Sequence, residues 1–142
     1  MIIDQSKFEQ LLEDVSETKI QSTNFDVLHR KITIIVEPFK KEPVTIVFNK
    51  VSSFYFVENN GKARFDIGKV DPGDYTELTS LGYYKDGIGK IAIDSSLSWA
   101  RQWYSSANFA MELWAAILFV EAQTITIDGE TFEVGYPIVE DK

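Results

Sequence analysis

The sequence predicts a mainly β fold of the α+β class, an antiparallel β-sandwich or meander with a short N-terminal amphipathic helix. Runs of β-branched and aromatic residues recur at short intervals along the chain. Three pairs that favour tight hairpins separate such runs: Asn60-Gly61, Asp86-Gly87 and Asp128-Gly129. A helical apolar period, in contrast, occurs near the N-terminus, over residues 6–15.

The helix is predicted over residues 6–15. Phe8, Leu11, Leu12 and Val15 follow the i, i+3, i+4, i+7 spacing of one helical face. Ser6 precedes a glutamate by three residues, which is the spacing of a capping box, so Ser6 is the expected N-cap. We expect the apolar face to pack on the core and the acidic residues to face solvent.

Strands are predicted from residue 20 onward. Residues 31–37 alternate β-branched apolar residues with polar ones. Pro38 and Pro43 bracket a turn, because proline cannot donate to a central strand ladder. Two strands follow at residues 44–48 and 51–57, and the second has apolar groups on both sides, as in a bent strand or one covered on both faces.

The later segments are defined by their turn residues. The predicted hairpins join residues 51–58 to 63–67, precede a strand at 88–93, and join 124–127 to 131–134. Asp71-Pro72-Gly73-Asp74 is a predicted turn, residues 75–84 fit no single pattern, and residues 95–106 read as an irregular or short helical link.

The longest apolar stretch, residues 107–122, fits either a helix or a strand. Its alanine, methionine, glutamate and leucine are good helix formers. As a strand, every second residue from 109 to 119 is apolar, which gives one unbroken face. We predict a strand, with a bulge near Glu121-Ala122 that lets the chain continue into residues 124–127.

Length and composition predict one domain over residues 1–142, cytoplasmic and not bound to a membrane. The N-terminus lacks the basic and apolar regions of a signal peptide. The longest apolar run, residues 113–120, is far short of the ~20 residues of a membrane helix. The chain has no cysteine, which excludes disulfides and thiolate metal sites.

The charge is negative and uneven. The formal net charge is −8. Residues 1–18 carry five acids against one lysine, and residues 103–142 carry seven acids against one lysine. Such a protein repels phosphates, so we expect no direct nucleic-acid partner. It attracts basic protein surfaces.

No catalytic motif is present, so we expect neither an enzyme nor a cofactor. His29 is the only histidine, which excludes a metal site built on several histidines, and no G-x-S-x-G nucleophile turn occurs. We predict no metal site. A carboxylate-based enzyme using His29, Asp71 and Asp74 is the weakest of three functional hypotheses.

Several short phrases are similar to those of a class of small acidic proteins from Gram-positive bacteria. These phrases are Glu112-Leu113-Trp114, Phe119-Val120-Glu121-Ala122 and Ile125-Thr126-Ile127-Asp128-Gly129, with Phe25-Asp26-Val27-Leu28 before residues 32–37. Members of that class are encoded beside secreted polymorphic toxins, including the WapA-type contact-dependent toxins that attack tRNA, and act as their immunity proteins. The resemblance implies a stoichiometric inhibitor that occludes a toxin active site, and it transfers no site residue.

The first functional hypothesis is therefore an immunity protein that binds the basic active site of a toxin domain, and we expect that domain to be a nuclease. The expected partner-binding residues are Glu112, Trp114, Glu121, Asp128, Glu130 and Glu133. The alternative is a β-sandwich module that binds a carbohydrate or other small ligand through Trp99, Trp103, Tyr104 and Trp114. Packing in the core or at its rim is the commoner role of tryptophan in a small β domain, and we expect it first.

Overall fold

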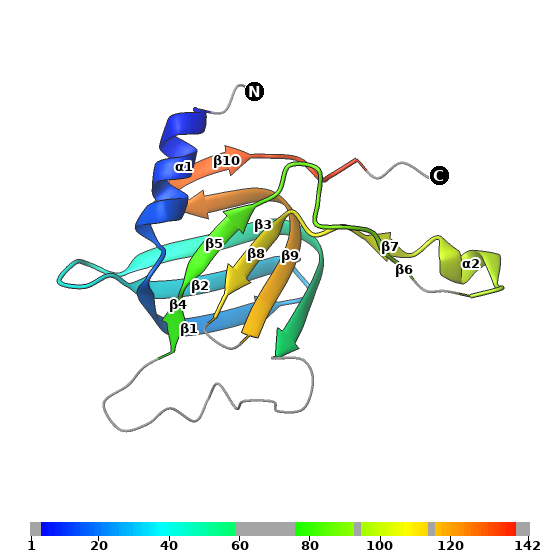
Figure 1. The fold of residues 1–142 in the computed structure, drawn as a ribbon, viewed down its shortest axis with the longest axis horizontal. Coiled ribbons are helices and arrows are strands. Elements are labelled where there is room, and N and C mark those ends of the chain that lie inside the picture. The colour runs from blue at the N-terminus through cyan, green and yellow to red at the C-terminus, as the bar shows by residue number, and fades with distance from the viewer. Residues whose placement is uncertain (1–3, 59–75, 93–94, 114–115, 139–142) are drawn as a thin grey trace.

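The computed structural model describes residues 4–58, 76–92, 95–113 and 116–138, and it confirms a mainly antiparallel β fold with a short N-terminal helix (Figure 1). The described residues form one eight-stranded and one two-stranded sheet. The elements are α1 (Gln5–Asp14), β1 (Thr18–Asp26), β2 (Lys31–Glu37), β3 (Val44–Glu58), β4 (Glu77–Leu78), β5 (Ser80–Tyr83), β6 (Ile91–Ala92), α2 (Ser98–Arg101), β7 (Tyr104–Ser105), β8 (Phe109–Glu112), β9 (Ala116–Ile127) and β10 (Glu130–Glu133).

The larger sheet curves until its two edges meet. Its strand order is β4-β1-β2-β3-β9-β8-β5, and β10 pairs with β9 outside this order. The edge strands β4 and β5 are separated in sequence only by Thr79, so residues 77–83 pair with β1 in their first part and with β8 in their second. Ile32, Ile34 and Val36 of β2 point inward, as predicted, and join one contiguous apolar core.

Helix α1 lies beside β5 and β10, with its apolar face on the core. Phe8 is buried, and its ring packs on Phe132 of β10 and on Tyr83 of β5. The predicted N-cap is wrong. The helix begins at Gln5, and the carboxylate of Asp4 accepts a hydrogen bond from the backbone N–H of Lys7 at 3.1 Å. Asp4 therefore satisfies one of the free N–H groups of the first turn, which was the role expected of Ser6.

Strand β3 replaces the two strands predicted at residues 44–48 and 51–57. It is continuous, and its register against β9 shifts between Val51 and Ser53. The extra residue, Ser52, lies opposite Glu121 and Ala122. The predicted bulge is therefore at the expected place in the ladder, but the inserted residue belongs to β3. A bulge bends its strand, which explains why apolar residues occur on both sides of this segment.

The stretch 107–122 is extended, as predicted, but it is a hairpin and not a single strand. Strands β8 and β9 pair with each other, Phe109 facing Val120 and Glu112 facing Ile117. The buried positions change parity across the connection. Met111 is buried before it, and Leu118 and Val120 are buried after it. The single apolar face predicted over residues 109–119 is therefore wrong. The sequence did not indicate a hairpin here, because it has no glycine, proline, asparagine or aspartate between the two strands.

The two remaining hairpin predictions differ in outcome. The β9–β10 hairpin turns at Asp128-Gly129 with φ of 51° and 81°, as a two-residue type I′ turn requires. Asp86-Gly87 also turns, since Gly87 N–H donates to the Tyr84 carbonyl. The chain after it, however, leaves β5, and β6 pairs with β7 instead. The short helical link predicted over residues 95–106 is present as α2.

Some predictions fall outside the described residues. These are the Asn60-Gly61 hairpin with residues 63–67, the Asp71–Asp74 turn, and Trp114. Among the described residues, no helix is long and apolar enough to cross a membrane.

Candidate functional site

Acidic side chains from three separate segments meet at a cleft beside the C-terminal end of α1. The cleft has a volume of about 280 Å³ and lies between α1, the loop joining β2 to β3, and the β9–β10 turn. Its walls carry three acids, Asp14, Glu42 and Asp128, and one base, Lys41. We call these four residues with their apolar neighbours the acidic cleft. It joins the two acidic ends of the sequence in one place.

Local structure fixes the walls of the acidic cleft. Asp128 occupies the left-handed region, and its backbone N–H donates to the Thr45 carbonyl of β3 at 3.1 Å. The opposite wall is a tight turn in which Lys40 also has a positive φ and Lys41 N–H donates to the Pro38 carbonyl. Asparagine and aspartate tolerate a positive φ better than most residues. Aspartate at position 128 therefore fits the backbone of the turn and also supplies a negative charge to the cleft.

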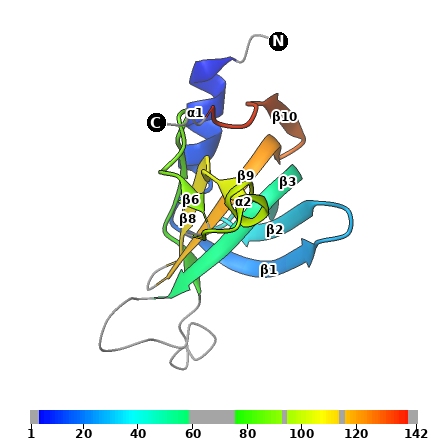
Figure 2. The same ribbon diagram turned by 90° about the vertical axis from the view of Figure 1, so that its right-hand side faces the viewer.

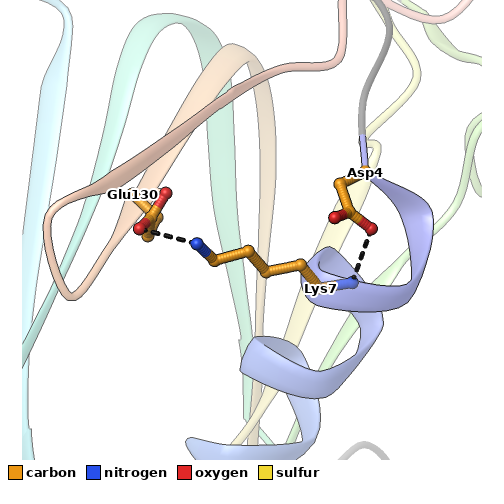
Figure 3. Close-up of polar contacts among 3 residues, drawn as sticks. All are labelled: Asp4, Lys7 and Glu130. Carbon is orange, nitrogen blue, oxygen red and sulfur yellow. Dashed lines mark hydrogen bonds and ion pairs between the residues drawn. The ribbon is translucent and has the colours of Figure 1, made fainter.

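A second link joins the acidic segments nearer the start of α1. The ammonium group of Lys7 lies 2.7 Å from a carboxylate oxygen of Glu130 on β10 (Figure 3). Both side chains are about half exposed, with relative areas of 49% and 50%. Such a pair contributes at most about 1 kcal/mol, so it orients the hairpin against the helix more than it stabilises the fold. It also offsets part of the negative charge of Glu130.

The structure separates the acids predicted to bind a partner. Asp128, Glu130 and Glu133 are exposed on the β9–β10 hairpin, and Glu133 accepts a hydrogen bond from Gln123. Glu112 lies at the other end of β9, opposite Ile117. Ten residues of strand separate Ile117 from the β9–β10 turn, roughly 30 Å at about 3.3 Å per residue. Glu112 therefore cannot share one small contact surface with Asp128.

Glu121 does not face a partner, because it is buried. Its residue exposure is only 8%, and one carboxylate oxygen accepts a hydrogen bond from the backbone N–H of Ser106 at 2.8 Å. The other oxygen accepts one from the hydroxyl of Ser52. The prediction of Glu121 as a contact residue is wrong. The sequence of β9 alone does not indicate that Glu121 is buried, because its hydrogen-bond partners come from β3 and from the segment before β8.

Ser106 and Asn108 hold the segment that enters β8, and neither was singled out from the sequence. The buried amide of Asn108 donates to the carbonyls of Ala122 and Gly135 and accepts from the N–H of Ala122. Ser106 also meets the 84–90 turn, since its hydroxyl accepts from Gly89 N–H at 3.3 Å. A methyl group added to Gly87 would lie 1.9 Å from that hydroxyl. These contacts hold the 84–90 turn and the segment between β7 and β8 against β9.

The burial of Glu121 also affects a neighbouring tyrosine. Tyr55, on β3, stacks on Phe119 of β9 with ring centroids 4.8 Å apart. Partial burial raises the pKa of Tyr55 above its ordinary value of 10.0, and the negative charge of Glu121 adds to that increase. Both effects disfavour the tyrosinate.

Strands β6 and β7 with helix α2 project from the body of the protein (Figures 1 and 2). We call this unit the aromatic arm. Trp99 and Trp103 are 61% and 67% exposed, and Tyr104 is half exposed with the Lys90 ammonium 4.5 Å from its ring centroid. The expectation that the tryptophans pack in the core or at its rim is therefore wrong for these two.

Of the residues proposed for a carboxylate-based enzyme, His29 is described, whereas Asp71 and Asp74 lie outside the described residues. His29 is exposed, and its Nδ1 lies 2.8 Å from a carboxylate oxygen of Asp26. This hydrogen bond lowers the pKa of Asp26 below its ordinary value of 3.8. The described residues contain no group of three or more histidine, aspartate or glutamate side chains placed to hold a metal ion.

Comparison with known proteins identifies a family. The family model described as YxiG-like protein matches residues 8–132, from Phe8 in α1 to Phe132 in β10. The protein YxiG of Bacillus subtilis strain 168, described as uncharacterized, is 26% identical over 113 residues, which cover 77% of this chain and 78% of YxiG. The matched region contains the sheet, the aromatic arm and the buried Glu121. The chain belongs to the YxiG-like protein family.

Proposed function

We propose that this protein is an immunity protein, a stoichiometric inhibitor that binds the basic active-site surface of a bacterial toxin domain, a nuclease in the simplest case. The observation that carries the proposal is the acidic cleft, where Asp14, Glu42 and Asp128 line one concavity. A lysine or arginine of the partner fits such a cleft. An acidic surface at this place competes with phosphate for the cations of a nuclease.

The aromatic arm projects from the side of the sheet opposite α1 (Figure 1), so it offers a second, separate contact region to a partner large enough to span both. Interfaces draw most of their binding energy from a few tryptophan, tyrosine and arginine residues. Trp99, Trp103 and Tyr104 are exposed and offer such groups. Partner binding through these surfaces needs no cofactor and no reaction catalysed by this chain.

The test is protection and complex formation with the toxin-like domain encoded beside the gene. Cells that express the domain together with this protein should survive, and the two purified proteins should form a one-to-one complex. If cells die despite stable expression of this protein, the proposal is refuted.

Two charge reversals locate the contact. Glu42→Lys and Glu112→Lys change the net charge equally, and both positions are exposed. Only the first lies in the acidic cleft. We expect Glu42→Lys to weaken the complex at least tenfold and to reduce the salt dependence of association, while Glu112→Lys stays within about twofold. Equal effects of the two variants would exclude the acidic cleft as the interface.

A second candidate function is a module that binds a carbohydrate or other small ligand. The exposed rings of Trp99 and Trp103 favour it, because aromatic faces stack on sugar rings. Titration of tryptophan fluorescence with a panel of glycans tests this function. A saturable change that is lost in Trp99→Ala and Trp103→Ala would support it, and an unchanged signal across the panel would exclude it.

A further inference from the structure

An apolar cavity opens on the inner side of the curved sheet, at the end away from α1 and the β9–β10 turn. Its volume is about 340 Å³. It is lined by Ile20, Thr23, Phe25, Ile34, Phe54, Phe56, Met111, Leu113 and Leu118. Thr23 is the one polar side chain among these described residues. The size and the apolar wall are those of a site for a small organic ligand.

The aromatic residues of this cavity are not sealed in the core. Phe25, Phe54 and Phe56 are 42%, 39% and 48% exposed. The rings of Phe25 and Phe54 lie together, with centroids 5.1 Å apart. These partly exposed rings leave the cavity open to solvent on their side. The exposed apolar area favours an occupant that is itself a hydrocarbon.

A second, polar depression adjoins the apolar cavity. It has a volume of about 410 Å³, shares Phe54 with the cavity, and carries Asp26, Arg30 and Lys31. The carboxylate of Asp26 is held by His29. The lining of this depression carries two basic groups, Arg30 and Lys31, against one acidic group, Asp26.

Arg30 is positioned firmly at the wall of the polar depression. It donates from Nε to the Val51 carbonyl at 3.2 Å and from Nη2 to the Tyr136 hydroxyl at 2.7 Å. A guanidinium has five N–H groups. The remaining three have no hydrogen-bond partner among the described residues. A guanidinium in this state is suited to donate hydrogen bonds to a carboxylate.

We propose that the cavity and the polar depression together form a binding site for a fatty acid. The hydrocarbon chain occupies the apolar cavity between β1, β3 and the β8–β9 hairpin. The carboxylate lies beside Arg30 and Lys31, on the far side of Phe54. The site is separate from the acidic cleft, so its occupancy is independent of the toxin-binding proposal.

Calorimetry tests the site with laurate and myristate below their critical micelle concentrations and with dodecanol below its solubility limit. We expect one saturable site, with myristate bound about tenfold more tightly than laurate because two more methylene groups are buried. Dodecanol, which lacks the carboxylate, should bind more weakly than laurate. Absence of saturable binding to the folded protein would overturn the proposal.

Two matched pairs of variants assign the two halves of the site. Thr23→Trp fills the cavity from its rim and should abolish binding, whereas Asn24→Trp, at the next residue of β1, lies outside the lining and should not. Lys31→Glu should weaken laurate about tenfold and leave dodecanol unchanged, whereas Lys41→Glu, in the acidic cleft, should affect neither. Circular dichroism confirms that each variant is folded. If Thr23→Trp and Asn24→Trp bind laurate equally well, the cavity does not hold the hydrocarbon chain. If Lys31→Glu and Lys41→Glu bind laurate equally well, the polar depression does not hold the carboxylate.

Discussion

Replacing the buried Glu121 with alanine should destabilise the protein by about 2–3 kcal/mol. Glu121→Ala removes the acceptor of the Ser106 N–H, which is buried and has its hydrogen bond at 2.8 Å. A buried donor left without a partner costs about 1–3 kcal/mol. Truncation also deletes the packed γ-methylene group, worth about 0.8 kcal/mol. The alanine variant no longer buries a carboxylate, and removal of that desolvation penalty offsets part of the loss. Ser52 keeps an acceptor, since its hydroxyl also donates to the Glu121 backbone carbonyl.

Glu121→Gln is the matched control. Glutamine keeps the volume, and its amide oxygen can accept from Ser106 N–H while its amide N–H₂ donates to the Ser52 hydroxyl. We expect a loss below about 1 kcal/mol for this variant. Urea unfolding followed by circular dichroism measures both values. In thermal melts the alanine variant should unfold roughly 6–9 °C earlier, at about 3 °C per kcal/mol for a chain of this size. Equal stabilities for the alanine and glutamine variants would refute the role of the buried hydrogen bonds.

Three further predictions concern the turns and the exposed ion pair. Gly87→Ala should cost more stability in urea unfolding than Gly129→Ala, because both glycines have φ near 80° but only the first would place its methyl against a serine hydroxyl; equal losses would leave backbone strain as the only effect. Asp4→Ala should lower the free energy of unfolding by about 1 kcal/mol through loss of the N-cap, and an unchanged value would show that another residue caps α1. The pKa of the Asp26 carboxyl, measured by NMR, should lie below 3.8 and should move toward 3.8 in His29→Ala; an unshifted pKa would contradict the hydrogen bond. Because the folded pKa is depressed, the stability that this group contributes is present above pH 3.8 and is lost as the pH falls through the folded pKa.

Features with a local physical cause were predictable from the sequence. The apolar face of α1 follows from residue spacing, and β2 follows from alternation of β-branched residues. The Asp128-Gly129 hairpin follows from a backbone geometry that few other residue pairs adopt. The acidity of both chain ends was also visible, because charge is additive along the sequence. Each of these features depends on residues that are neighbours in the chain.

The tertiary structure decided where these features meet. Glu121 and Glu112 read alike in sequence, yet one is buried under Ser52 and Ser106 and the other is exposed. The turn between β8 and β9 has no residue that marks it, so strand pairing alone sets its place and the parity of the buried face. The acidic cleft exists because α1 packs beside β10, which brings residues from both ends of the chain together. Burial and proximity arise from contacts between residues distant in sequence, and a local pattern carries no record of them.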